Sequence, residues 1–437
     1  MSINNFKKIG LVAGLSLLAS PALAEVPGET AFIFNTLLFL IMGAFVMWMA
    51  AGFAMLESGM VRSKNVATIC VKNVALFAIA GILYYLVGYN LMYSGVDAGF
   101  IGEFTMWSPD DSAYLGETPD FGEGDTYSAG SDWFFQMVFV ATAASIVSGT
   151  LAERIKLWPF LGFVAVLTAF IYPIQGAWTW GGGWLSEMGF SDFAGSTIVH
   201  SVGGWAALTG AIILGARTGR YNANGSPVAM PGSSMPLATL GTFILWLGWF
   251  GFNGGSQLAL GSAENAIAIS QIFINTNLAA AGGVVAAMIA TQLVYKKVDL
   301  TLALNGAIGG LVSITAEPLA PTGAMAIIIG AIGGLLVVFA VPVLDRLKID
   351  DVVGAIPAHL VCGIWGTLAV VLSNGEASLV TQLIGIAAVG GFVIVSSAIV
   401  WVVFKAIFGI RVSAEEEMIG LDKTELGIEA YPEFSRG

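Results

Sequence analysis

The chain has 437 residues, of which 57% are hydrophobic and only 11% are charged, and its formal net charge is −12. Soluble globular chains carry about 25% charged residues, so this composition, with a mean hydropathy of +0.83, excludes a soluble enzyme and a disordered chain. The acidic balance argues against a nucleic-acid-binding protein, and two cysteines provide neither a disulfide framework nor a thiolate metal site. We therefore expect an all-α polytopic membrane protein.

The first 24 residues have the pattern of a cleavable secretory signal peptide. Lys7 and Lys8 precede a short apolar run, 9–18, and an Ala-x-Ala sequence ends at Ala24. This pattern predicts cleavage after Ala24, because the run is shorter than the roughly 20 residues that a membrane span needs. The alternative is that the segment remains as a first helix. Cleavage would leave the mature N-terminus outside, as expected for a protein of a bacterial inner membrane.

Eleven apolar stretches follow, each long enough to cross a hydrocarbon core of about 30 Å. They lie near residues 31–56, 66–89, 131–152, 157–175, 195–215, 236–258, 267–295, 300–316, 322–344, 354–373 and 380–407. We therefore predict a transmembrane domain of eleven helices over residues 25–408, followed by a cytoplasmic tail over residues 409–437.

The basic residues predict the orientation of these helices. Lys and Arg in short loops remain on the cytoplasmic side, whereas Asp and Glu contribute little to orientation. After the signal peptide, fourteen of the fifteen basic residues fall on segments that face the cytoplasm if the N-terminus is outside, and none falls on an external segment. The fifteenth, Lys72, lies in the inner third of the second span. The chain is therefore predicted to run from N-out to C-in.

The longest predicted external segment, about 96–130, contains eight acidic residues and no basic residue. A solvated loop accounts for this composition. Alternatively, the segment forms a negative vestibule that raises the local concentration of cations near an entrance. The sequence is compatible with both interpretations.

An internal repeat surrounds the two histidines, the only ones in the chain. The pattern Asp-x2-Gly-x4-His runs from Asp192 to His200 and again from Asp351 to His359, and a glycine follows four residues after each histidine. One copy enters its span from outside and the other from inside. This arrangement predicts two five-helix halves of opposite orientation, an inverted repeat typical of transporters, with the eleventh helix as an addition.

The spacing within each copy predicts where its polar side chains lie. Eight residues of helix advance about 12 Å, so each aspartate lies near its own membrane surface and both histidines lie near the centre. Ionisable groups at that depth usually line a pathway or relay protons, although a packing role is the alternative. Asp192 and Asp351 are best explained as helix caps. Asp192 could also stabilise a cation, because it would face the external entrance.

Aromatic side chains flank the repeats. Trp180 precedes three glycines, Phe252 lies in a glycine-rich segment, and Phe135 and Phe139 are one helical turn apart, so that they share a face. Ordinary packing explains such residues, but aromatic faces also hold small cations by cation–π attraction of about 1–2 kcal/mol. A small cation that can lose its charge as a proton would suit an aromatic mouth above an apolar pore lined by histidines.

The sequence does not favour an enzyme, a metalloprotein or a cofactor-binding protein. Two histidines with no carboxylate at the same depth make a poor zinc or copper site. We also find no Ser-His-Asp set, HExxH motif or further polar cluster within the spans. We therefore predict neither a bound metal nor a cofactor.

The chain resembles the Amt/Mep/Rh ammonium transporters, and within them the bacterial Amt branch, over essentially all residues that follow the predicted signal peptide. The most specific motifs are Glu57-Ser-Gly-Met-Val-Arg62-Ser-Lys64-Asn65, Gly149-Thr-Leu-Ala-Glu153-Arg154, Asp192-Phe-Ala-Gly195, Gly248-Trp-Phe-Gly-Phe-Asn253 and Arg411-Val-Ser-Ala-Glu-Glu-Glu-Met-Ile-Gly420-Leu-Asp422.

This resemblance implies an external site that recruits ammonium. Trp180, Phe135 and Ser256 match the residues of that site, and Asp192 matches the carboxylate beneath it, whose role is either deprotonation or helix capping. Ammonium, with methylammonium as an additional substrate, is therefore the expected ligand.

The resemblance also implies a gated pore. Phe139 and Phe252 match the stacked pair that closes the outer pore, and His200 and His359 match the twin histidines that line it and share a hydrogen. Ammonium would lose its proton near the gate and cross as ammonia. An alternative function is an ammonium sensor that signals through a cytoplasmic partner.

Members of the family are homotrimers with one pore per subunit, and a PII-type signal protein blocks many bacterial members from inside. Two departures from the family pattern affect these expectations. Ala358 and Leu360 flank His359 where Val and Gly are common, so packing beside that ring should differ. Leu426 replaces a frequent histidine in the tail, which puts the details of tail regulation in doubt.

Overall fold

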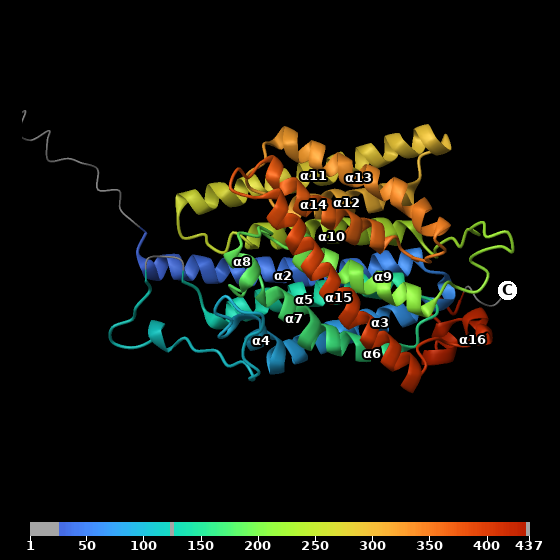
Figure 1. The fold of residues 1–437 in the computed structure, drawn as a ribbon, viewed down its shortest axis with the longest axis horizontal. Helices are drawn as coiled ribbons and strands as arrows, with labels where there is room; N and C mark the ends of the chain where they lie inside the picture. The colour runs from blue at the N-terminus through green and yellow to red at the C-terminus, as the bar shows by residue number, and fades with distance from the viewer. Residues whose placement is uncertain (1–25, 123–125, 434–437) are drawn as a thin grey trace, which may run out of the picture.

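The computed structural model describes residues 26–122 and 126–433, and its ordered elements in these ranges are helical (Figure 1). The predicted signal peptide, residues 1–24, lies outside the described residues. So do Glu123, Asp125 and Arg436, which contribute to the predicted charge pattern.

Within the described ranges, nine helical stretches are long and apolar enough to cross a membrane. They are Gly28–Met60, Ser63–Tyr93, Ala129–Thr150, Leu157–Ala177, Ser196–Leu214, Met235–Gly255, Ala263–Tyr295, Gly323–Arg346 and Leu379–Ile407. Two shorter apolar helices span Leu300–Ile314 and Ile356–Leu372. Each predicted span overlaps one of these helices, so the multi-pass helical architecture is confirmed. The count of eleven crossings and their orientation stay predictions.

The individual helices, labelled as in Figure 1, are often parts of these stretches. Their bounds are α2 Gly28–Met60, α3 Val66–Leu83, α4 Tyr89–Tyr93, α5 Ala129–Thr150, α6 Leu157–Val166, α7 Tyr172–Ala177, α8 Trp184–Glu187, α9 Val202–Leu214, α10 Met235–Gly255, α11 Ala263–Tyr295, α12 Leu300–Thr315, α13 Gly323–Arg346, α14 Cys362–Ala369, α15 Leu379–Ile407 and α16 Ala414–Ile419. Two π-helical segments, Tyr84–Gly88 and Leu167–Ile171, join neighbouring helices, and two more, Ser196–Ser201 and Ile356–Val361, lead into α9 and α14. A fifth, Asp422–Leu426, lies in the tail.

The first helix extends further than its apolar run. The predicted span ends at residue 56, but α2 continues through Glu57 to Met60. The helix can include this buried carboxylate because Ser148 Oγ and Asn73 Nδ2 donate hydrogen bonds to Glu57 Oε2 over 2.8 and 3.2 Å. Hydropathy alone misses such a continuation, because the compensating donors come from other helices.

The two copies of the histidine repeat have the same local structure. Gly195 and Gly354 both have positive φ, at 108° and 79°, and a π-helical segment follows each of them. His200 lies in Ser196–Ser201 and His359 in Ile356–Val361. Isolated π-helical turns are uncommon and occur frequently at functional sites. The matching turns therefore support the repeat that the spacing predicts.

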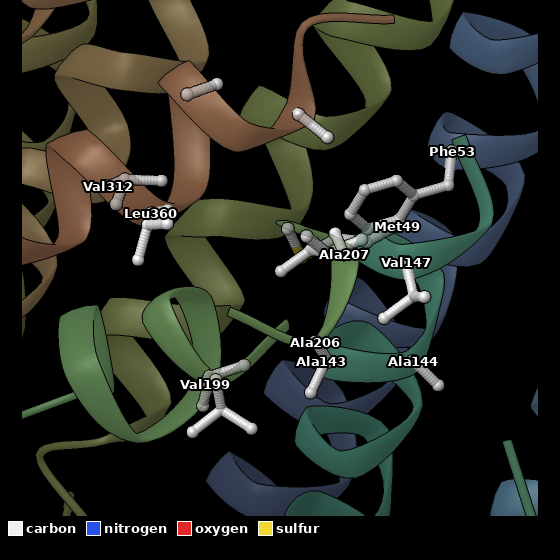
Figure 2. Packing of buried hydrophobic residues seen from close by; sticks show 14 of the residues in the cluster. Met49, Phe53, Ala143, Ala144, Val147, Val199, Ala206, Ala207, Val312 and Leu360 are labelled. Atoms are coloured by element: carbon white, nitrogen blue, oxygen red, sulfur yellow. The ribbon is translucent and has the colours of Figure 1, made fainter. Parts of the chain in front are cut away.

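Buried side chains from several helices close around these two segments (Figure 2). The cluster includes Met49 and Phe53 from α2, Ala143, Ala144 and Val147 from α5, Ala206 and Ala207 from α9, and Val199, Val312 and Leu360. The many small residues allow close approach of the helices, as in other membrane bundles.

The acidic segment between α4 and α5 is a loop in which several aspartates stabilise turns. Asp110 accepts a hydrogen bond from Ser112 N over 3.0 Å, and Asp111 accepts one from Ala129 N, at the start of α5, over 2.8 Å. These contacts give part of the acidic character a local structural role. They leave the vestibule interpretation as a prediction.

A buried charge network joins the loops at the end of the molecule where the tail lies. Arg217 Nε contacts Asp350 Oδ2 at 2.8 Å, Arg217 Nη1 lies 3.4 Å from Glu153 Oε2, and Arg62 also pairs with Glu153. Burial raises the pKa of Asp350, but hydrogen bonds and charge from Arg217 outweigh burial and hold that pKa well below its usual range. Asp350 is therefore ionised at neutral pH.

The C-terminal tail binds the start of α3. Asp422 accepts hydrogen bonds from Ala67 N and Thr68 N over 2.9 and 2.8 Å, and Leu421 N donates to Asn65 Oδ1 over 2.9 Å. A residue 354 positions away in sequence thus caps a core helix. The tail is a packed part of the fold over the residues that the structure describes.

Candidate functional site

A column of rings connects Trp180 with His359. Trp180 meets the ring of Phe139 edge-on at 6.0 Å between centroids, and Phe139 lies 4.0 Å from Phe252. Phe252 lies 5.1 Å from His200, which in turn lies 5.3 Å from His359. Five residues from separate parts of the chain therefore form one continuous column.

Trp180 begins this column and is held by its own polar atom. Its Nε1 donates a hydrogen bond to the backbone carbonyl oxygen of Asp192 over 3.0 Å, and the side chain is half-buried. A Cβ at Gly195 would lie 3.1 Å from the indole ring, so the ring lies directly on this residue. One face of Trp180 is thus supported by the turn that leads to His200.

Phe135 and Ser256 lie beside the same end of the column. The ring of Phe135 is buried and lies 4.8 Å from that of Phe139. It packs so closely on Gly255 that any Cβ there would collide with it, which places it next to Ser256. Ser256 is half-buried, and its Oγ donates to the carbonyl oxygen of Phe252 over 2.8 Å. The hydroxyl oxygen keeps acceptor capacity for a further donor.

The carboxylate of Asp192 caps the helical segment that contains His200. It accepts backbone hydrogen bonds of 2.8–3.0 Å from the four residues Gly195, Ser196, Thr197 and Ile198. Burial raises the pKa of Asp192 to about 6, and these four bonds limit the rise. Capping is therefore confirmed as a role of this side chain, and its carbonyl additionally holds Trp180.

Asp351 has the corresponding role in the second copy of the repeat. Its carboxylate accepts hydrogen bonds from Gly354 N over 3.1 Å and Ile356 N over 2.7 Å, and Thr150 Oγ1 donates a third over 3.1 Å. Capping is thus confirmed for both aspartates.

Phe139 and Phe252 separate the histidines from the Trp180 end. Both side chains are at most 1% exposed, and their rings lie at an angle of 31°. Their rings therefore lie in contact with each other between Trp180 and His200.

The two histidines face each other through their Nδ1 atoms, which lie 3.2 Å apart. One ring must donate and the other accept, so the pair carries a single hydrogen between the two Nδ1 atoms. In a neutral pair, one Nε2 then carries a hydrogen and the other carries a lone pair. Nε2 of His200 is fully buried and has no hydrogen-bond partner among the described residues. The pair thus offers one donor and one acceptor to a small neutral molecule.

Glycines hold the two histidine segments in close contact. A Cβ at Gly204 would lie 2.6 Å from the Cβ of Leu360, and a Cβ at Gly363 would lie 2.5 Å from Ser201 Oγ. Each glycine follows its histidine by four residues and faces the residue directly after the other histidine. The unusual Leu360 beside His359 therefore packs on the backbone of the first copy, where it is 4% exposed.

Two aromatic residues that pack beside the histidines of the column were not predicted from the sequence. Trp249 stacks on His200 at 4.9 Å, and its Nε1 donates to Thr315 Oγ1 over 2.8 Å. Phe53 lies 6.1 Å from His359. Trp249 precedes Phe252 by three residues and so shares its helix face, which was the available signal. Phe53 resembles any other core aromatic residue in sequence.

The described residues contain no group of three or more His, Cys, Asp or Glu side chains arranged to hold a metal ion. The two histidine Nδ1 atoms contact each other, and Asp192 and Asp351 cap helical segments. Aromatic rings, the two imidazoles, the Ser256 hydroxyl and backbone groups therefore make up most of the site.

Comparison with known proteins identifies the type of protein that has this fold. Residues 37–431 match the model of the family described as Ammonium Transporter Family. The chain is 43% identical to ammonium transporter Amt2 of Archaeoglobus fulgidus, over 90% of this chain and 87% of that protein. It is 40% identical to a putative ammonium transporter of Synechocystis sp., over 92% and 91% of the two chains.

Solved structures give the same result. One described as a sensor Amt protein aligns with a TM-score of 0.85 and 35% identity, over 91% of this chain and 99% of that chain. Mep2 of Candida albicans aligns with a TM-score of 0.77 and 26% identity, over 92% and 91%. The family match over residues 37–431 includes every residue of the ring column and most of the tail.

Proposed function

The chain belongs to the ammonium transporter family, and from this premise we propose that it conducts ammonium across the membrane as neutral ammonia. The observation that carries the proposal is the histidine pair, His200 and His359, buried at the end of an apolar ring column. Moving an isolated ion into such surroundings is very costly. Ammonia carries no charge, and it both donates and accepts hydrogen bonds, so it can pair with the unpartnered Nε2 of His200 in either tautomer.

Recruitment of the cation belongs to the opposite end of the column. Trp180 offers an aromatic face, and Ser256 keeps a hydroxyl acceptor next to Phe135. Cation–π attraction of about 1–2 kcal/mol suffices to concentrate a partly desolvated ammonium ion there. Asp192 adds negative charge below this position and fixes Trp180 through its carbonyl. Before the Phe139–Phe252 pair opens to admit ammonia, ammonium transfers its proton to a base at this end, which is either external water or the Asp192 carboxylate.

We extend the proposal to the placement of the chain. Residues 1–24 are removed as a signal peptide, residues 25–408 form eleven spans of the inner membrane from N-out to C-in, and residues 409–437 are a cytoplasmic tail. The basic residues on the predicted inner segments support this orientation. By analogy with the family, the assembly is a homotrimer, and the cytoplasmic face is the place where a PII-type protein would bind.

Uptake of labelled methylammonium, in cells that lack other ammonium transporters, tests this function. We expect uptake by the native chain, a loss of at least tenfold in Trp180→Ala, and a strong loss in His200→Ala. Trp158→Ala is the matched control, because Trp158 is 77% exposed at the start of α6 and is not one of the residues of the ring column. Unchanged uptake in both site variants, at equal protein levels, would refute the proposal.

An electrical measurement decides whether the proton crosses with ammonia. The unperturbed pKa of histidine, about 6.5, allows an imidazole to relay a proton. Current evoked by ammonium in proteoliposomes would show coupled proton movement. Uptake without current would show passive conduction of ammonia.

A sensor is the second candidate function. It is favoured by the similarity to the structure described as a sensor Amt protein, which covers nearly the whole of that chain. A sensor would bind ammonium and signal through a cytoplasmic partner while conducting little. Saturable ammonium binding by the purified chain, with no methylammonium flux in proteoliposomes, would favour the sensor over the transporter.

A further inference from the structure

We propose that Glu57 forms a second cation-binding site on the cytoplasmic side of the histidine pair, for a small cation that carries N–H donors. Ammonium and methylammonium have this chemistry. The inference rests on the proposed function, because the cation would reach Glu57 from the cytoplasmic end of the same pathway. This site would bind the cation on the cytoplasmic side of the histidine pair, whereas Trp180 binds it on the external side.

The position of Glu57 supports this assignment. Glu57 and His359 line the same small cavity, together with Phe53, Asn305 and Val353. Asn305 and Val353 also line a second cavity of about 420 Å³, whose walls contain both acidic residues, Asp299, Asp345 and Asp351, and the basic residues Arg217 and Arg220. The shared residues make the two cavities neighbours. The larger cavity therefore lies next to the one that Glu57 shares with the second histidine.

The carboxylate of Glu57 has one oxygen that the protein does not satisfy. The side chain is 1% exposed, and its Oε2 accepts hydrogen bonds from Ser148 and Asn73. Its Oε1 is buried and has no hydrogen-bond partner among the described residues. An unsatisfied acceptor on a buried charged group is costly, and a cation with N–H donors in the cavity would satisfy it.

Lys72 balances the charge of Glu57 without occupying this oxygen. Its Nζ donates to the backbone carbonyl of Ser148 over 2.9 Å and lies 4.5 Å from the centroid of the Phe160 ring. Ser148 thus separates the two charges, with its hydroxyl on Glu57 and its carbonyl on Lys72. Asn73 uses its amide nitrogen for Glu57 Oε2 and for the carbonyl of Ile69. Neither neighbour satisfies Oε1.

Space beside the carboxylate depends on a residue without a side chain. A Cβ at Gly149 would lie 3.3 Å from Cγ of Glu57 and 2.5 Å from a methyl group of Val353. Gly149 therefore packs closely against both Glu57 and Val353, so that any side chain there would displace the carboxylate or the wall that the two cavities share. The cavity and the free oxygen together define the site.

The test measures methylammonium flux from each side of the full-length chain, reconstituted in proteoliposomes of one orientation. In Glu57→Gln, we expect the half-saturating concentration for flux from the cytoplasmic side to rise at least fivefold, while the external value stays unchanged. Trp180→Ala should show the reverse. A purely structural role of Glu57 would alter both values together or neither, and either result overturns the proposal.

Two further measurements keep the test decisive. Because Glu57→Gln leaves Lys72 without its counter-charge, the double variant Glu57→Gln/Lys72→Met restores neutrality and should show the same one-sided change. In the purified native chain, ammonium chloride should shift a carboxylate infrared band that Glu57→Gln lacks, whereas sodium chloride should not. If the native chain conducts no methylammonium but shows this band shift, the proposed transport function fails and the site stands. If the band does not respond, the site fails.

Discussion

Replacing Gly363 by alanine should separate the two segments that carry the histidines. A Cβ at this position would lie 2.5 Å from Ser201 Oγ and still closer to the carbonyl oxygen of Ser196. The serine hydroxyl can rotate away, at the loss of its 3.1 Å hydrogen bond to Ser196, but the backbone carbonyl cannot. Because real Cβ atoms essentially never approach within 3.0 Å of another heavy atom, the segments must shift by more than half an ångström.

The cost follows from two effects. Overpacking a well-packed core typically costs about 1–3 kcal/mol. A shift of this size also stretches the 3.2 Å contact between Nδ1 of His200 and Nδ1 of His359 beyond hydrogen-bond range, which removes about 0.5–1.5 kcal/mol. We therefore expect Gly363→Ala to lower the free energy of unfolding by about 1.5–4.5 kcal/mol. Uptake should fall even at temperatures where the protein remains folded.

Gly391→Ala is the matched control. Gly391 also lies in a helix, α15, but a Cβ there would meet no heavy atom within 4 Å. Alanine at this position should be neutral or stabilising by up to about 1 kcal/mol, because its helix propensity exceeds that of glycine. Thermal unfolding in detergent and methylammonium uptake measure both variants. If Gly363→Ala matches Gly391→Ala in melting temperature and uptake, the close contact between the two histidine segments at Gly363 does not position the histidines as we infer.

Two further predictions concern the buried charge network around Asp350 and the contact of the C-terminal tail with α3. Asp350→Asn should cost about 3 kcal/mol, because it removes the charge that neutralises buried Arg217. The pKa of Asp350 is lower in the folded than in the unfolded protein. Its contribution to stability is therefore fully present above the unfolded pKa of about 3.9, and it is lost only as the pH falls through the folded pKa. The loss of melting temperature in Asp350→Asn should thus be equal at about pH 5.5 and about pH 8. Asp422→Ala removes two caps from the start of α3 and should cost about 0.5–2 kcal/mol. It should also speed limited proteolysis of the tail, whereas Glu415→Ala, at an exposed position of α16, should not; equal rates would show that Asp422 does not anchor the tail.

Much of the local architecture could be predicted from the sequence, because it depends on neighbours in the chain. Hydropathy located the helical stretches, and the spacing Asp-x2-Gly-x4-His predicted that Asp192 and Asp351 cap the segments carrying the histidines. Those caps span three to six residues. Phe135 and Phe139 were likewise placed on one face by their spacing, and their rings do meet.

The boundaries of α2 show where such reasoning ends. Hydropathy ends the first span before Glu57, because a charge is costly in an apolar helix. The helix continues because Ser148, 91 residues away in sequence, donates a hydrogen bond to that charge. No local pattern reveals this compensation.

The amino-acid sequence by itself determined the membrane class, the repeat and the residue types of the ring column, since these follow from composition and local spacing. Only the tertiary structure decided which of them touch. His200 and His359 are 159 residues apart in sequence. Their 3.2 Å contact depends on the close packing of the two histidine segments at Gly204 and Gly363. The free oxygen of Glu57 is equally a product of packing, because whether a buried group is satisfied depends on partners that the fold brings from distant helices.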